Sequence, residues 1–191
     1  MIPLPELYIL RHGETLWNAQ GRMQGALNSA LTDTGREQAA RQGAILQGID
    51  LAAFDVLCSP QGRAFETAAI ALARQVAHVH TDTRLREIGV GDWAGKLRAE
   101  LSVGRPVTEG PDGALELYEH APGGEGFAAL EARCSAFLHS LTRPSVLVTH
   151  GITSRMLRAI ATGAGRAGLE GIGGGQGVVF HISGGSQKRL E

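Results

Sequence analysis

The sequence predicts a three-layer α/β fold, in which a mostly parallel central sheet is covered by helices on both faces. A short apolar run, a polar turn and a helical segment follow one another three times along the chain. Runs of four or five apolar residues between breakers are typical of strands that are buried on both faces, as in parallel sheets. With 191 residues, of which 43% are hydrophobic, the chain fits a single domain over residues 1–191 with a sizeable core.

In the first half of the chain, capping residues mark where two helices begin. Thr32 or Thr34 provides a capping hydroxyl for the first helix, and Ser59-Pro60 places a capping hydroxyl before a proline for the second. Alternating apolar residues predict a short strand after the second helix. The elements expected in this half are a strand over 7–10, a loop over 17–29, a helix to about residue 47, a strand over 54–58, a helix to about residue 74 and a strand over 76–80.

The second half of the chain begins with a segment that has little regular periodicity. It is rich in Gly, Pro and acidic residues from 102 to 126, and we interpret residues 88–125 as a lid-like insertion over one face. An amphipathic stripe predicts the helix that follows, and an apolar run predicts the strand after it. The elements expected here are a helix over 126–141, a strand over 145–149, a helix over 153–162, a loop over 163–177, a strand over 178–182 and a frayed polar tail.

Charge and cysteine content exclude several classes of protein. The formal net charge of −1 provides no basic field for nucleic acid or for an anionic membrane surface. Cys58 and Cys134 are too few and too far apart for a disulfide framework or a four-ligand zinc site, so we expect two buried thiols. Because the chain has no apolar run of about 18 residues and no secretion signal, we expect a cytoplasmic protein that does not span a membrane.

The turns of the three strand–helix units carry the residues that indicate function. They supply Arg11 with His12, then Arg63, then His150. Because the carboxyl ends of parallel strands meet at one edge of a sheet, we expect these four side chains to lie together. Taken alone, His150 would equally fit a buried structural histidine, and Arg63 a solvated helix residue. Together, two guanidinium groups, two imidazoles and a helix N-terminus favour a phosphoryl group as the ligand.

Short motifs spread over nearly the whole chain resemble the signature of the histidine phosphatase superfamily, also called phosphoglycerate mutase-like. The most specific of them is Leu10-Arg11-His12-Gly13-Glu14-Thr15, followed by Trp17-Asn18. The others occur in the expected order and are Gly21-Arg22-x-Gln24-Gly25, Leu31-Thr32-x-x-Gly35, Ser59-Pro60-x-x-Arg63-Ala64-x-x-Thr67-Ala68, Leu85-Arg86-Glu87-Ile88, Pro122-Gly123-Gly124-Glu125 and Val148-Thr149-His150-Gly151 with Arg155.

The resemblance implies a fold, a chemistry and a role for each matching position. His12 would be the nucleophile and form a phosphohistidine, and Glu87 would be the general acid that protonates the leaving oxygen and then activates water. From the residues alone, Glu87 would be interpreted as an exposed loop carboxylate. No metal or organic cofactor is implied. The residues implied to hold the phosphoryl group or to line the substrate side are Arg11, Asn18, Gln24, Arg63, His150 and Gly151.

Several positions depart from the usual pattern of that family, and Asn28 and Glu66 are two of them. Asn28 stands where Asp is common. Glu66 stands where Gln is common, and we expect it to pair with Arg63 one helical turn away. Neither departure touches the residues implied to carry out phosphoryl transfer, so they bear on the substrate pocket.

Three functions remain open, and the sequence favours hydrolysis of small phosphomonoesters. The segment after Glu87 is short and carries only Lys96, Arg98 and Arg105 as cations, whereas a mutase needs more positive charge to retain its substrate. Mutase-type phosphoryl transfer is the alternative, and a non-catalytic phospho-ligand binder is disfavoured because His12 and Glu87 are both present. The expected partner is a small phosphorylated metabolite, and the apolar final strand could pair with a second copy to form a homodimer.

Overall fold

A computed structural model describes residues 4–102 and 115–191 of the chain. In this part of the chain, six strands form one mixed sheet in the order β3-β2-β4-β1-β5-β6. Strands β3, β2, β4 and β1 run parallel, and β5 and β6 extend the sheet in antiparallel pairings. The strands are β1 (Leu7–Arg11), β2 (Asp55–Cys58), β3 (His80–Thr81), β4 (Ser145–Thr149), β5 (Val179–Ser183) and β6 (Ser186–Leu190).

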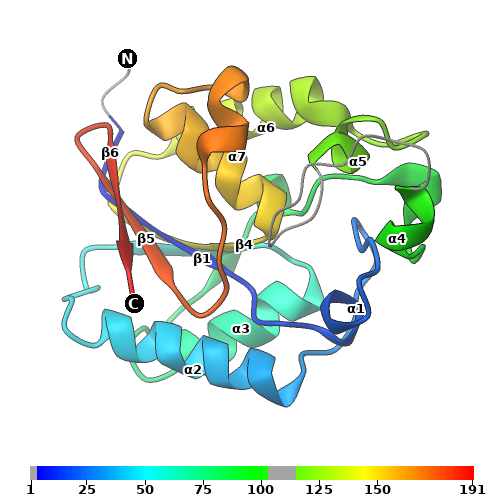
Figure 1. The fold of residues 1–191 in the computed structure, drawn as a ribbon. Coiled ribbons are helices and arrows are strands. Elements are labelled where there is room, and N and C mark those ends of the chain that lie inside the picture. The colour runs from blue at the N-terminus through cyan, green and yellow to red at the C-terminus, as the bar shows by residue number, and fades with distance from the viewer. Residues whose placement is uncertain (1–3, 103–114) are drawn as a thin grey trace.

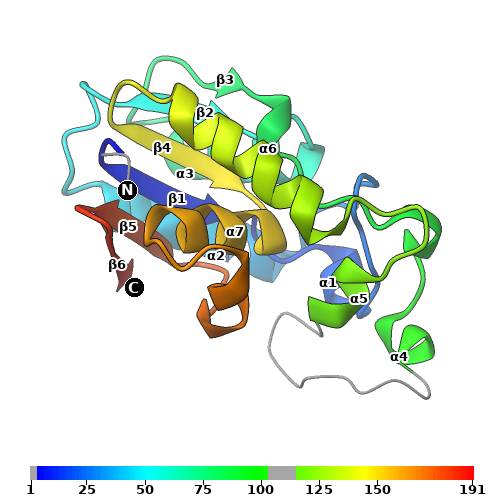
Figure 2. The same cartoon turned by 90° about the horizontal axis from the view of Figure 1, so that it is seen from above.

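Helices cover both faces of the sheet, which confirms the predicted three-layer fold. Figure 1 shows α6 and α7 on one face and α2 and α3 on the other, while α1, α4 and α5 lie beyond the carboxyl ends of the parallel strands (Figure 2). None of the helices in the described residues has the length and apolar character needed to span a bilayer. The α-helices are α1 (Leu16–Ala19), α2 (Asp33–Leu46), α3 (Gly62–Leu72), α4 (Arg98–Leu101), α5 (Leu115–Glu119), α6 (Gly126–Ser140) and α7 (Gly151–Ala161), and 3-10 helices cover Thr83–Leu85, Gly91–Trp93 and Arg166–Gly171.

The central strand β1 contributes side chains to the hydrophobic cores on both faces of the sheet. Leu7 and Ile9 belong to the core beneath α6 and α7, whereas Tyr8 and Leu10 belong to the core beneath α2 and α3. This division follows from the two-residue period of a strand, which turns successive side chains to opposite faces. It explains why β1 is a continuous apolar run instead of an alternating one.

Helix α3 begins later than its sequence predicts. Its N-cap residue is Gln61, so the prediction that Ser59-Pro60 caps this helix is wrong. The hydroxyl oxygen of Ser59 lies 2.7 Å from Nε2 of His150 instead, and it accepts a hydrogen bond from the backbone of Gln61. The Ser59 hydroxyl, which the local pattern assigned to a helix cap, therefore contacts the distant His150 instead. Helix α2, in contrast, has the expected cap, since the Thr32 side chain accepts from the backbone N–H of Gly35.

The strand predicted over 76–80 is reduced to the two residues of β3. Strand β2 offers β3 only Leu57 and Cys58 as partners. Before β3, Val76 and Val79 pack against the core beneath α2 and α3 without joining the sheet. These apolar side chains therefore contribute to the core and do not take part in strand pairing.

Three segments expected to be irregular contain short regular elements. The loop predicted over 17–29 begins within α1, whose N-terminus is capped by the side chain of Thr15. The insertion predicted over 88–125 includes α4, α5 and a 3-10 helix, and its residues 103–114 lie outside the described residues. The loop predicted over 163–177 contains another 3-10 helix.

The C-terminal tail was expected to be frayed but forms strand β6. Ser183 pairs with Ser186, so Gly184-Gly185 is a two-residue hairpin turn with φ values of +57° and +76°. A type I′ turn requires positive φ at both positions, which glycine adopts without steric strain. Because β5 is paired with β1 and β6 on its two sides, this apolar strand has no free edge for the homodimer contact that its sequence suggested.

Candidate active site

The carboxyl ends of β1, β2 and β4 border one pocket of about 350 Å³, measured to its opening into solvent. All of the predicted site residues except His150 line it, and His150 lies buried directly behind His12. The parallel sheet has thus brought the predicted residues together at one edge. The lining residues are Arg11, His12, Asn18, Gln24, Gly25, Arg63, Glu87, Arg98, Tyr118, Gly151 and Ile152.

The imidazole of His12 is held in one tautomer. Its Nδ1 lies 2.7 Å from the carbonyl oxygen of Gly13, which can only accept, so Nδ1 carries the proton. Its Nε2 accepts a hydrogen bond from Nε of Arg63 at 3.2 Å. Burial, together with the charges of Arg63 and Arg11, holds the pKa of His12 well below its ordinary value. The ring is therefore neutral and has its lone pair on Nε2.

The guanidinium of Arg63 is aimed into the pocket by the loop that precedes α2. It donates to the carbonyl oxygens of Gly25 at 3.0 Å and Leu27 at 2.7 Å, and to His12. These contacts use three of its five N–H groups and leave two for a ligand. Burial lowers the pKa of Arg63 to about 10, so it remains a cation at neutral pH.

His150 occupies the N-cap position of α7, directly after β4. Its ring centroid lies 5.1 Å from that of His12, and its Nε2 is 2.7 Å from Oγ of Ser59. Its Nδ1 is buried and has no hydrogen-bond partner in the described part of the chain. Burial and the neighbouring charge of Arg63 lower the pKa of His150 well below its ordinary value. A buried nitrogen without a partner beside guanidinium groups is suited to contact an oxyanion.

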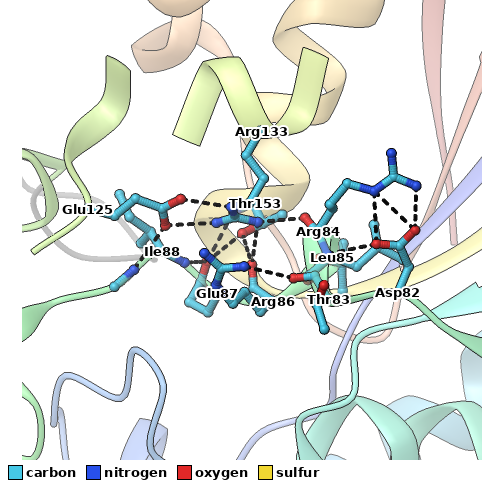
Figure 3. Close-up of polar contacts among 12 residues, drawn as sticks. Asp82, Thr83, Arg84, Leu85, Arg86, Glu87, Ile88, Glu125, Arg133 and Thr153 are labelled. Atoms are coloured by element: carbon cyan, nitrogen blue, oxygen red, sulfur yellow. Dashed lines mark hydrogen bonds and ion pairs between the residues drawn. The ribbon is translucent and has the colours of Figure 1, made fainter. Parts of the chain in front are cut away.

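Glu87 is buried at the N-terminus of α7 and is not an exposed loop carboxylate. Its Oε1 accepts hydrogen bonds from the backbone N–H groups of Ile88 and Thr153, each at 3.0 Å (Figure 3). Its Oε2 accepts a hydrogen bond from the backbone N–H of Ile152 at 3.2 Å. First-turn N–H groups of a helix favour a carboxylate. The α7 residues that donate to Glu87, Ile152 and Thr153, lie 65 and 66 positions away in the sequence. No local pattern could therefore have identified Glu87.

The part of the pocket lined by Asn18 and Gln24, for which substrate contacts are predicted, also contains residues that were not predicted to belong to the site. Asn18 and Gln24 are both tied to Thr15, whose Oγ1 accepts from the Asn18 backbone at 3.1 Å and from Nε2 of Gln24 at 2.8 Å. Arg98 from α4 and Tyr118 from α5 also line the pocket and are joined by a hydrogen bond of 3.0 Å. From the sequence, Arg98 was recognised only as a cation and Tyr118 only as an apolar side chain near the mouth of the site.

The two cysteines do not line the pocket. Cys58 and Cys134 are free and buried, as predicted, and burial raises the pKa of each thiol to about 12. Within residues 4–102 and 115–191, no three His, Cys, Asp or Glu side chains come together in a way that could hold a metal ion.

Comparison with known proteins identifies the family. The family model of the histidine phosphatase superfamily (branch 1) matches residues 7–188. The chain belongs to this superfamily. The match spans β1 to β5, the first part of β6 and every residue that lines the pocket, so the predicted family is confirmed over the part of the chain that carries the site.

Relatives within the superfamily carry both phosphatase and mutase names. A glucosyl-3-phosphoglycerate phosphatase from Mycolicibacterium vanbaalenii is 35% identical over 162 residues, which cover 76% of this chain and 68% of that protein. Phosphoglycerate mutase-like protein 4 from Arabidopsis thaliana is 36% identical over 159 residues, which cover 80% of this chain and 69% of that protein.

Solved structures of the superfamily share the fold. That of a mycobacterial glucosyl-3-phosphoglycerate phosphatase in complex with VO3 has a TM-score of 0.76 and 30% identity, covering 98% of this chain and 97% of that one. The α-ribazole phosphatase from Shigella flexneri has a TM-score of 0.79 and 27% identity, covering 97% and 94%.

The structure shows the contacts of Asn28 and Glu66, two of the positions that depart from the usual pattern of the superfamily. Oδ1 of Asn28 accepts a hydrogen bond of 2.9 Å from the backbone N–H of Arg63. Asn28 therefore caps α3 from a distant loop, since the N-cap residue itself makes no side-chain cap bond. Glu66 pairs with Arg36 at 3.4 Å, so the prediction that it pairs with Arg63 is wrong. The Arg63 side chain is engaged by backbone carbonyls and His12 instead.

Proposed function

We propose that the protein is a metal-independent phosphatase that hydrolyses small phosphomonoesters through a phosphohistidine on His12. The observation that carries this proposal is the fixed tautomer of His12, which presents an unprotonated Nε2 in a pocket that also contains Arg11 and Arg63. Histidine is one of the side chains that form covalent intermediates in group transfer. Guanidinium groups match the equatorial oxygens of a phosphoryl group in the transition state.

In the first step, Nε2 of His12 attacks phosphorus and the bond to the ester oxygen breaks. The N–H of Arg63 that contacts Nε2 turns to a phosphoryl oxygen, and Nδ1–H on the Gly13 carbonyl stabilises the positive charge that develops on the ring. Glu87 gives its proton to the departing oxygen. Because Oε1 is held by two backbone N–H groups and Oε2 by one, Oε2 is the oxygen that reaches the leaving group.

In the second step, the Glu87 carboxylate takes a proton from water as the water oxygen attacks phosphorus. The phosphorus–nitrogen bond breaks, and the electron pair returns to Nε2 of His12. The products are inorganic phosphate, neutral His12 and protonated Glu87, which is ready for the next ester. His150 and the two arginines hold the phosphoryl oxygens through both steps.

A second candidate is mutase-type phosphoryl transfer, and Arg98 is the observation that favours it. Arg98 lines the pocket, and no acidic side chain of the described residues forms an ion pair with it. A carboxylate on the substrate, as in a phosphoglycerate, would be a suitable partner. Relatives with glucosyl-3-phosphoglycerate phosphatase and phosphoglycerate mutase-like names support a phosphorylated metabolite of this kind.

The test is phosphate release from a panel of esters in the presence of a chelator. The panel contains 3-phosphoglycerate, glucosyl-3-phosphoglycerate, glycerol phosphate and 4-nitrophenyl phosphate. Wild type and the control His139→Ala, which changes an exposed histidine of α6, should release phosphate, whereas His12→Ala should not. Release that survives His12→Ala would contradict the proposed nucleophile. No release from any ester, but interconversion of phosphoglycerates with a bisphosphoglycerate primer, would favour the mutase.

We also propose that the protein works in the cytoplasm. The support is that Cys58 and Cys134 are free and buried, with burial raising the pKa of each thiol to about 12. Buried free thiols suit a reducing compartment.

A further inference from the structure

An ion pair outside the pocket joins Arg133 of α6 to Glu125, the N-cap residue of the same helix, beside the segment that carries Glu87 (Figure 3). Nε of Arg133 lies 2.7 Å from Oε1 of Glu125, and Nη2 lies 2.8 Å from Oε2, so the pair is bidentate. The two side chains are 9% and 13% exposed. Burial alone would raise the pKa of Glu125, but Arg133 outweighs burial and holds this pKa below its ordinary value. The pair is therefore charged and shielded from solvent.

The same arginine also binds the backbone on the N-terminal side of Glu87. Its Nη1 donates to the carbonyl oxygen of Arg84 and, at 3.0 Å, to that of Arg86. These contacts together with the ion pair employ every nitrogen of the guanidinium. A lysine could not reproduce them, because an ammonium group has three donors at one point in place of a planar fork.

Glu125 binds the backbone on the C-terminal side of Glu87. Its Oε2 accepts from the N–H of Gly89 at 3.2 Å, and its own backbone N–H donates to the Gly89 carbonyl at 2.9 Å. Arg133 thus binds the backbone immediately before Glu87, and Glu125 binds the backbone two residues after it. The carboxylate of Glu87 is meanwhile held on its other side by α7, through the backbone N–H and the hydroxyl of Thr153 at 3.0 Å.

We infer that Arg133, oriented by Glu125, is a positioning residue that keeps the carboxyl group of Glu87 within reach of the leaving oxygen. The inference rests on the function proposed above. Neither Arg133 nor Glu125 lines the pocket, so Arg133 acts through the backbone of residues 84–89 and not on the substrate. Proton transfer requires hydrogen-bond distance between acid and leaving oxygen, and a small displacement of the acid removes that contribution.

The dependence of kcat/KM on the leaving group separates this positioning role from a general effect on the stability of the fold. A nitrophenolate leaves readily as an anion, whereas an alkoxide needs a proton as it departs. The ratio kcat/KM reports on the steps up to departure of the leaving group, before the phosphohistidine is hydrolysed. We expect Arg133→Gln to lower kcat/KM for glycerol phosphate about 100-fold, the lower end of a general acid's contribution. The loss for 4-nitrophenyl phosphate should be below about fivefold, because its leaving group requires little protonation.

The experiment compares four variants of the full chain on both esters. Glu87→Gln should show the same selective loss as Arg133→Gln, and the double variant should be no more selective than Glu87→Gln alone. The matched control is Arg158→Gln, which removes another buried arginine that donates to a backbone carbonyl, that of Gly173. It should lower kcat/KM for both esters by the same factor. If Arg133→Gln does not fold, Arg133→Lys takes its place, because it keeps the charge facing Glu125. It should show the same selective loss of kcat/KM for glycerol phosphate.

The outcomes distinguish this inference from the proposed function. If wild type hydrolyses neither ester, or if Glu87→Gln is not selective, the proposed function or its general acid is wrong. If Glu87→Gln is selective while Arg133→Gln and Arg133→Lys lower both esters equally or not at all, the positioning role is refuted and the proposed function stands.

Discussion

A methyl group at position 151 provides a sharp test of the proposed phosphate site. Gly151 is the first residue of α7 and lies against the guanidinium of Arg11. A Cβ built there would be 3.2 Å from the guanidinium carbon and 3.3 Å from Nε, whereas ordinary contacts fall between 3.4 and 4 Å. In Gly151→Ala, the end of the Arg11 side chain must therefore move by a few tenths of an ångström, while the backbone can stay in place.

The size of the effect follows from that displacement. A misplacement of about 1 Å near the reacting atoms can lower the rate about 100-fold, so a few tenths of an ångström should cost about five- to tenfold. This corresponds to about 1 kcal/mol of transition-state stabilisation. Stability should not fall, because alanine is favoured over glycine in a helix by up to about 1 kcal/mol. The expected result is a loss of kcat/KM without a loss of thermal stability.

The assay measures kcat/KM for 4-nitrophenyl phosphate and the midpoint of thermal unfolding on the same preparations. Gly48→Ala is the matched control, since a Cβ at that position meets nothing within 4 Å. Wild-type kcat/KM in Gly151→Ala would refute the reasoning that Arg11 is held in its working position by this contact. A fall of several degrees in the unfolding midpoint would equally refute it, because the close contact would then have strained the rest of the structure and not only displaced the Arg11 side chain.

Two further predictions concern stability. The pKa values of His12 and His150 are lowered in the folded protein. Below about pH 6.5, and above their pKa values in the folded protein, these two imidazoles therefore bind a proton only in the unfolded chain. The free energy of unfolding should accordingly decrease as pH falls from 7.5 to 5.5. Urea unfolding at these two pH values measures it, and a stability that is constant or higher at pH 5.5 would contradict it. Asn28→Ala removes the side-chain acceptor at the start of α3 and should cost about 1 kcal/mol, or about 2–4 °C in the unfolding midpoint. Asn28→Asp keeps the acceptor and should retain the wild-type midpoint, and equal losses in both variants would show that Asn28 is not a cap.

The sequence by itself determined the parallel strands at the centre of the sheet and most of the proposed phosphate site. Apolar runs identify β1, β2 and β4 because strands buried on both faces need apolar side chains at every position, which is a property of neighbouring residues. Once those strands are parallel, their carboxyl ends must share an edge, so Arg11, His12, Arg63 and His150 are brought together by connectivity alone.

Only the tertiary structure decided which groups the site residues contact. The hydroxyl of Ser59 had two uses, a helix cap or a partner for His150, and the packing of β2 beside β4 selected the second. The residues around Glu87 in the sequence indicate a solvated carboxylate, whereas in the structure it accepts hydrogen bonds from N–H groups of α7, more than 60 residues away. Tyr118 and Arg133 likewise owe their surroundings to contacts between distant segments. Such contacts depend on how helices pack over the sheet, and a local pattern of residue types carries no record of that geometry.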